Sequence, residues 1–156
     1  MKTRFRFRLE AVEKVRRIKE EEALRGLASA QAKYHETLRA KQRILEANDH
    51  ALARRDALAG TPQPVLAFQI ENEFISGNRQ RLVQADHAIL RSRKFVEKAL
   101  REVIMAKRAL RAIELLREKA YAEFKTELRK REQKSMEELY ANLPRSEEEF
   151  EWSESA

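Results

Sequence analysis

The chain has 156 residues, of which 38% are charged and 7% are aromatic, and its formal net charge is +7 at pH 7. Three Gly, three Pro and no Cys, with abundant Ala, Glu, Lys, Leu and Arg, are typical of long helices or coiled coils and argue against a packed globule. No apolar run approaches the roughly 20 residues that a membrane span needs. We expect no signal peptide, because arginines interrupt the N-terminal apolar residues. The absence of cysteine fits a cytoplasmic protein.

The N-terminal stretch FRFRLE, residues 5–10, alternates apolar and charged side chains as a strand would. It could therefore be a strand, a basic arm or the first turns of a helix. Phe5, Leu9 and Val12 fall at i, i+4 and i+7, which is a helical stripe, and no second strand candidate is present. We predict that FRFRLE begins the first helix, with Thr3 as its N-cap.

The first helix is predicted to run from about residue 5 to about residue 59. The stretch LAGTPQPVL ends it, because Gly60 can cap a helix C-terminus and Pro62 and Pro64 cannot lie in a helix interior. The heptad phases of its apolar residues drift, which suits a helix that twists against a partner over many turns. Three phases are present: Leu24, Leu38, Leu45 and Leu52; Leu27 and Tyr34; Ala30, Ile44, Ala51 and Leu58.

The second helix is predicted from about residue 66 to about residue 142, after a loop of residues 60–65. From Ile75 to Phe124 its seam positions follow one another at steps of 3 and 4 for seven heptads, which is a strong coiled-coil pattern. One seam position is large and the other is mostly Ala or Ser, so the helices can approach closely. The residues expected to flank and widen this seam are Phe95, Leu100 and Leu116.

Neither helix can bury an apolar stripe alone, and a short loop favours antiparallel neighbours. We therefore predict an all-α fold, a long antiparallel two-helix coiled coil or α-helical hairpin, over residues 1–144. A parallel homodimer is the alternative, but it makes the proline loop hard to place. Residues 145–156 are acidic and lack helical periodicity, which predicts a disordered tail.

Positive charge gathers at one end of the predicted hairpin. Residues 1–19 hold eight Lys or Arg and two Glu, and residues 119–135 hold six Lys or Arg and three Glu. Both segments lie at the end opposite to the loop. The second helix also outlasts the first, and exposed apolar surface on a basic rod end suggests a docking site. The unpaired apolar stripe expected there consists of Leu128, Met136, Leu139 and Tyr140.

We expect no enzyme activity, because no constellation of catalytic residues is present. The nucleotide-binding loop G-x-x-x-x-G-K-[ST] is absent, and His35, His50 and His87 are too far apart for a local ligand motif. Glu-x-x-His pairs that would hold a metal in a helical bundle are also missing, so we expect neither cofactor nor metal. Lys and Arg are interleaved with Glu and there is no stacking platform, so we expect no nucleic-acid binding.

Two stretches give the chain a resemblance to a known family. The opening FRFRLEAVEKVRRIKEEEALRGLASAQ has an F-x-F-x-L-x-x-V core, then Arg, Glu and an Ala-rich stretch. The second stretch, AIELLREKAYAEFKTELRKREQKSMEELY, is a charged helix that contains E-Q-K-x-x-E-E. Together with the loop position and the total length, they resemble the FliJ family of flagellar type III export components. The resemblance covers about residues 4–140.

The resemblance implies an antiparallel coiled coil similar to the stalk in the γ subunit of rotary ATPases. It implies that the rod lies in or at the pore of the hexameric flagellar export ATPase and promotes its assembly and activity. The basic end corresponds to the end that enters the ring, and we expect it to dock electrostatically. The residues expected to contact the ring are Arg4, Arg6, Arg8, Arg16, Arg17, Arg129, Lys130 and Arg131.

The resemblance also implies a contact with the cytoplasmic domain of the membrane export-gate protein, and it admits export chaperones as partners. The location would be cytoplasmic, at most peripheral to the membrane, at the cytoplasmic face of the export apparatus. The gate-binding surface of the family lies toward the loop half of the hairpin. The residues expected there are Leu45, Leu52, Phe68, Phe74, Asn78 and Leu82, of which Leu82 and Leu45 also fit the core.

Two alternatives stay open at the level of the sequence. The chain could be the equivalent stalk of a virulence-type secretion system, although the FRFRLE start favours the flagellar version. It could also be a generic structural coiled coil, or a basic nucleic-acid binder, which predicts no effect on an ATPase.

Overall fold

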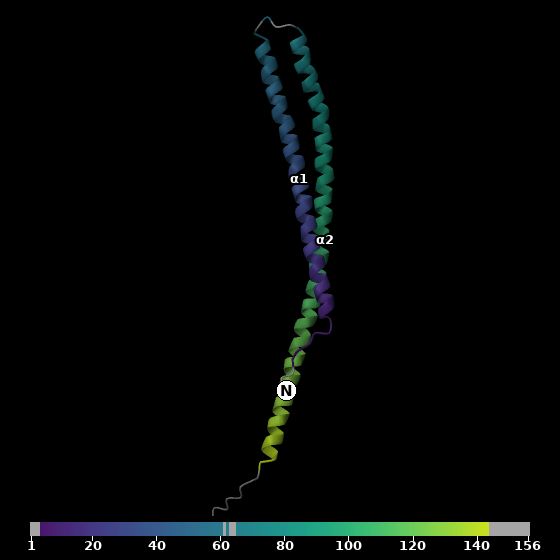
Figure 1. Ribbon diagram of the computed structural model, residues 1–156, viewed down its shortest axis with the longest axis vertical. Coiled ribbons are helices and arrows are strands. Elements are labelled where there is room, and N and C mark those ends of the chain that lie inside the picture. The colour runs from purple at the N-terminus through teal and green to yellow at the C-terminus, as the bar shows by residue number, and fades with distance from the viewer. Residues whose placement is uncertain (1–3, 61, 63–64, 144–156) are drawn as a thin grey trace, which may run out of the picture.

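The computed structural model describes residues 4–60, 62 and 65–143. In this part of the chain it contains two α-helices, α1 (Glu10–Leu58) and α2 (Val65–Ala141). They run antiparallel as a gently curved hairpin, with the loop at one end and a long extension of α2 at the other (Figure 1). The predicted all-α coiled-coil hairpin is confirmed.

The predicted seam of α2 is confirmed by burial. Every buried residue of α2 lies on the predicted 3-and-4 series: Ile75, Asn78, Ser92, Ala99, Val103, Leu110 and Ile113. Large and small seam residues alternate, as the sequence predicts. The three residues expected to flank and widen the seam contribute little to it, because their side chains stay largely exposed. Their exposed fractions are 66% for Phe95, 46% for Leu100 and 50% for Leu116.

On α1, only two of the three apolar phases enter the seam. The phases of Leu27 and of Ala30 are partly or fully buried at steps of 3 and 4. The leucine phase lies on the flank, with Leu24, Leu38 and Leu45 exposed by 40%, 38% and 37%. The reason is that the seam of α1 is completed by polar residues that pair across the interface. For example, the hydroxyls of Thr37 and Ser92 lie 3.1 Å apart.

The first helix begins later than predicted. Residues 4–7 have no helical hydrogen bonds, residues 8–9 form a turn, and α1 starts at Glu10, so the prediction that FRFRLE begins the helix is wrong. Phe5, Phe7 and Leu9 are partly buried while the arginines between them are exposed. This period of two is that of an extended segment packed by one face. The predicted N-cap, Thr3, lies outside the described residues.

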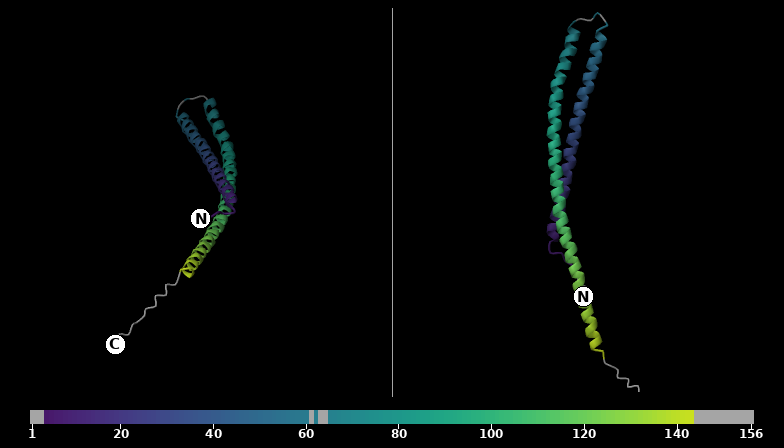
Figure 2. Two further views of the ribbon diagram at one scale, coloured as in Figure 1. Left: turned by 60° about the horizontal axis from the view of Figure 1, so that its bottom comes forward. Right: turned by 180° about the vertical axis from the view of Figure 1, so that it is seen from behind.

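The physical reason for the late start is the aromatic surface of α2. The Phe5 ring packs edge-on against Tyr121 at 5.2 Å between centroids and lies 5.5 Å from Phe124. If residues 5–9 continued the helix, Phe5 and Leu9 would lie on the same stripe as Val12. Val12 is 38% exposed, so this stripe does not lead into the seam. The segment of residues 4–9, named the arm from here on, therefore lies against α2 beyond the start of α1 (Figure 2).

Beyond the arm, α2 continues without a partner helix (Figure 1). The part of α2 from residue 125 to residue 141 is named the overhang. Met136, Leu139 and Tyr140 are exposed by 53%, 66% and 70%, while Leu128 is partly buried. The unpaired apolar stripe expected from the sequence is present. The predicted acidic tail, residues 145–156, lies outside the described residues.

Candidate interaction surfaces at the two ends of the rod

The arm turns an apolar face to α2 and a basic face to solvent. Arg4, Arg6 and Arg8 are exposed, because they alternate with Phe5, Phe7 and Leu9, which are partly buried. A groove of about 490 Å³ runs between the arm and α2. Its lining consists of four apolar and four charged residues: Phe7, Leu9, Leu116 and Ala120; Arg6, Arg8, Lys119 and Glu123.

A buried carboxylate joins the two helices just above the arm. Glu13 is 3% exposed and occupies the seam. Arg117 Nη1 donates to both of its oxygens, at 3.1 and 2.9 Å, and Arg17 Nη2 donates to Oε1 at 3.1 Å. Two guanidinium groups therefore offset the desolvation of one carboxylate, which is the arrangement a buried charge requires. The sequence placed Arg117 on the seam but gave no sign of its partner 104 residues away.

The cations expected to contact the ATPase ring form two groups, according to whether they make contacts within the hairpin. Arg16 Nη1 donates to the carbonyl oxygen of Ala109 at 2.7 Å, and Arg17 belongs to the Glu13 cluster, so these two stabilise the hairpin itself. The other six are exposed. Three lie on the arm, and three lie on the overhang: Arg129, Lys130 and Arg131.

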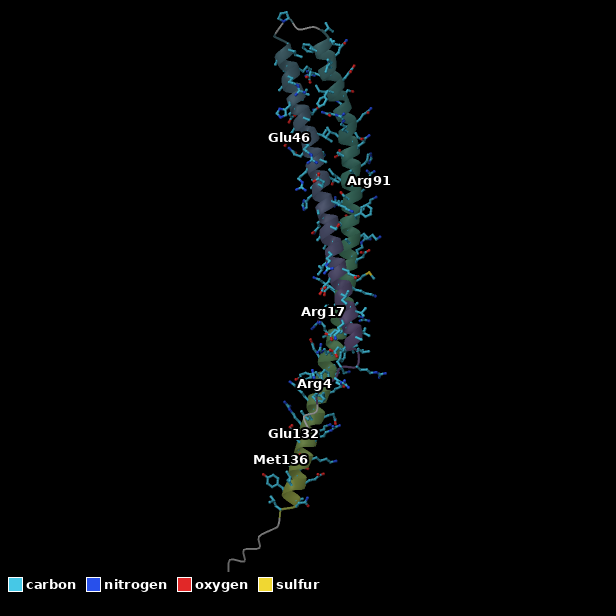
Figure 3. The ribbon with its side chains drawn as sticks, in the orientation of Figure 1. Arg4, Arg17, Glu46, Arg91, Glu132 and Met136 are labelled. Carbon is cyan, nitrogen blue, oxygen red and sulfur yellow. The ribbon has the colours of Figure 1, made fainter. Side chains whose placement is uncertain are left out.

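The hairpin brings all eight of these residues to one end of the rod. Figure 3 shows Arg17, Arg4 and the overhang residue Glu132 following one another along this end. Glu46 lies in the loop half and Arg91 lies nearer the middle (Figure 3). The predicted clustering of these cations therefore holds in space, although it extends along the rod and does not form a compact patch.

At the loop end, the residues expected to contact the gate protein differ in access. Leu45 is 37% exposed, and Leu52, Phe68 and Leu82 are partly buried. Phe74 is also partly buried, and the Arg81 guanidinium carbon lies 6.0 Å from its ring centroid.

Asn78 is 2% exposed and lies inside the seam. Its Oδ1 accepts a hydrogen bond from Arg81 Nη1 at 3.0 Å. Its Nδ2 and the Oδ1 of Asn48 are buried without a hydrogen-bond partner among the described residues. Both asparagines lie on the seam, where such residues are known to fix the register of coiled coils. Asn78 therefore belongs to the interface between the helices.

The described residues contain no group of three or more His, Cys, Asp or Glu side chains that could hold a metal ion. In the same part of the chain, neither helix has a stretch long and apolar enough to cross a membrane.

Comparison with known proteins gives one match. The family model described as the flagellar FliJ protein matches residues 5–149, nearly the whole chain. No curated protein and no solved structure matches the chain. The match confirms the resemblance carried by the FRFRLE opening and by the C-terminal half of α2. The chain belongs to the FliJ family of flagellar type III export components, which is not a family of enzymes.

Proposed function

We propose that this protein is the stalk that binds the hexameric flagellar export ATPase with its basic end and promotes the assembly and activity of the ring. The observation that supports this most is the exposed basic face of the arm. Arg4, Arg6 and Arg8 project from a segment that is fixed on α2 by Phe5. They lie beside the overhang cations, at the end that is narrow because only one helix continues there (Figure 1). Cations held on a rigid rod lose less entropy on docking than cations on a free tail.

Charge reversal on the arm tests this proposal. We expect Arg4→Glu/Arg6→Glu/Arg8→Glu to abolish stimulation of ATP hydrolysis, because like charges would then face the ring. The matched control reverses three exposed cations in the middle of α2, Arg91, Lys94 and Arg101, none of which has an ion pair in the described part of the chain. The control variant is expected to stimulate normally. Undiminished stimulation by the arm variant, with helicity intact in both, would remove the arm from the ring contact.

We further propose that the loop half contacts the cytoplasmic domain of the export-gate protein. The support is the partly exposed apolar group near the loop, formed by Leu45, Leu52, Phe68 and Phe74. Asn78 and Leu82 lie on the seam and would act by holding Phe74 in place. Export chaperones are a further proposed class of partner, and the proposed location is the cytoplasmic face of the export apparatus.

Binding to the purified gate domain tests the second contact. Leu45→Ala/Phe68→Ala is expected to weaken binding, because both side chains offer exposed apolar surface near the loop. Phe95→Ala is the matched control, since Phe95 is 66% exposed in the middle of α2. Equal affinities for the two variants would place the gate contact elsewhere.

A further inference from the structure

The overhang carries apolar side chains that α1 does not cover, and Phe124, just before it, is packed on one side by Phe5 of the arm. Phe124, Glu127, Leu128 and Arg131 line a small cavity of about 150 Å³ at its start. After the polar residues 129–135, apolar side chains occur again at Met136, Leu139 and Tyr140, which are exposed. Exposed apolar surface on a lone helix is typical of a docking site.

The cations around these apolar side chains have few partners. Among the described residues, Lys130 is the one overhang cation with an ion pair, 3.6 Å from Glu127. Lys125 Nζ lies 4.7 Å from the Tyr121 ring centroid, and no carboxylate lies within ion-pair distance of it in the described part of the chain. Arg129, Arg131 and Lys134 likewise have none there. Exposed cations without an ion pair among the described residues also occur in the middle of α2, for example Arg91 and Lys94. Those of the overhang differ because they border exposed apolar side chains.

The chain contains a segment of complementary chemistry. Residues 146–155 read SEEEFEWSES, with five Glu, no Lys or Arg, and two aromatic residues, Phe150 and Trp152. In an extended segment, residues two apart point to the same side, so Phe150 and Trp152 would share one face. Carboxylates and a pair of aromatic rings are what an apolar surface bordered by cations would bind.

The segment is long enough to reach the cavity. Leu143 lies two residues after the end of α2, and at the helical rise of 1.5 Å per residue Phe124 is about 28 Å back from it along the axis. An extended chain covers about 3.3 Å per residue, so Trp152 can lie up to about 30 Å from Leu143. Phe150, at up to about 23 Å, reaches Leu128. Because the segment is tethered, its effective concentration at the overhang is in the millimolar range, so weak contacts suffice.

We propose that residues 147–152 fold back along the overhang of the same chain. Phe150 and Trp152 occupy the apolar surface between Phe124 and Leu128, and the glutamates pair with Lys125, Arg129 and Arg131. The acidic segment thereby covers cations of the basic end. The regulatory consequence rests on the function proposed above: a partner that uses Arg129 and Arg131 must displace the segment first.

Trp152 is the only tryptophan of the chain, so it reports on its own environment. We expect its fluorescence to be shifted to the blue, and its quenching by acrylamide to be several-fold weaker than in a peptide of residues 144–156. Molar salt is expected to raise the quenching toward that of the peptide, because it screens the ion pairs. These results should not change on dilution, since the contact is within one chain.

The variant that tests the site is Lys125→Glu/Arg131→Glu, with Arg91→Glu/Lys98→Glu as the control of equal charge change in the middle of α2. The first variant is expected to expose Trp152 and the control to leave it shielded, with helicity checked for both. Quenching in the wild type equal to that of the peptide would overturn the proposal. So would equal shielding in both variants, or shielding that disappears on dilution, which would assign the contact to a second copy.

Removal of residues 145–156 tests the consequence separately. The truncated chain is expected to stimulate the export ATPase at a several-fold lower concentration than the full chain. If Trp152 is shielded but truncation leaves the ATPase titration unchanged, the segment docks on the overhang and its regulatory consequence is wrong. If neither chain stimulates hydrolysis while Trp152 is shielded, the proposed ATPase contact fails and the docking stands.

Discussion

Glu13 is the residue that joins the two helices at the basic end of the rod. Its carboxylate is buried in the seam, where a hydrophobic residue is the usual occupant. Two hydrogen bonds from Arg117 Nη1 and one from Arg17 Nη2 satisfy it. The side chains of Arg117 and Arg17 are 47% and 51% exposed, whereas that of Glu13 is 4% exposed. Removal of an arginine therefore leaves a buried charge, while removal of Glu13 leaves charges that water can reach.

We predict that Arg117→Ala lowers the free energy of unfolding by about 2 kcal/mol, because the buried carboxylate loses its main partner. Glu13→Ala is expected to cost less, since the freed guanidinium groups can be hydrated. Urea unfolding followed by circular dichroism measures both. Equal losses for the two variants, or no loss for Arg117→Ala, would show that the pair does not hold the helices together.

Glu36 gives a residue-scale test of the surface electrostatics. Hydrogen bonds from Arg43 at 2.8 Å and from Arg39 at 3.0 Å hold the pKa of its carboxyl below the ordinary value of 4.5. A lowered pKa means that the pairing stabilises the fold above the ordinary pKa, and that this contribution is lost as the pH falls through the folded-state pKa. We predict that Arg43→Gln raises the titration midpoint of Glu36 measured by NMR. Identical midpoints would contradict the assignment of Arg43 as the main partner.

At the scale of the elements, the two helices differ in how far their sequences predict them. The seam of α2 follows from a regular apolar period, which burial reproduces from Ile75 to Ile113. The seam of α1 does not, because Glu13, Arg16 and Lys41 occupy it while the leucines lie on the flank. A period search counts apolar residues, so it assigns the leucine phase to the interface. Such a search contains no information on the residues of the other helix that pair with polar seam positions.

The seam of α2 can be tested by matched truncations. Ile113 is 4% exposed, and Leu100, which the sequence placed at the edge of the seam, is 46% exposed. We predict that Ile113→Ala destabilises the hairpin by about 2–5 kcal/mol. Leu100→Ala is expected to cost much less, because its side chain buries little area. Similar losses in thermal unfolding would mean that Leu100 packs in the interface after all.

The arm is the element that the sequence predicts least well. Its apolar residues fit a helical stripe as well as an extended alternation, and the choice depends on Tyr121 and Phe124, more than a hundred residues away. Local propensity cannot include such a distant contact. The same holds for the candidate site: the hairpin topology predicts which cations share an end, but only the arm explains why three of them project outward.

Phe5 carries the contact that fixes the arm. We predict that Phe5→Ala releases it and speeds trypsin cleavage after Arg6 and Arg8 several-fold, because proteases cut flexible segments far faster than docked ones. Mass spectrometry of timed digests measures the rates. Phe95→Ala serves as a control aromatic truncation on exposed surface. Unchanged cleavage of the arm in Phe5→Ala would mean that the ring contacts do not hold it.

At the scale of the whole molecule, the rod has two different ends, joined by a seam whose side chains are mostly buried or partly buried. One end carries the arm, the Glu13 cluster and the overhang, and the other carries the loop between the helices and the apolar residues near it. A rigid link between two partners needs this separation, since each contact can form without obstructing the other. The polar positions within the seam help to keep the ends in register.

The central proposal is that the rod binds the ATPase ring through its basic end and stimulates it. The most direct measurement is ATP hydrolysis by the flagellar export ATPase of the same organism, titrated with the full chain at near-physiological salt. We predict stimulation that saturates with far fewer rods than ATPase subunits. Absence of stimulation, together with absence of co-sedimentation with the assembled ring, would contradict the claim.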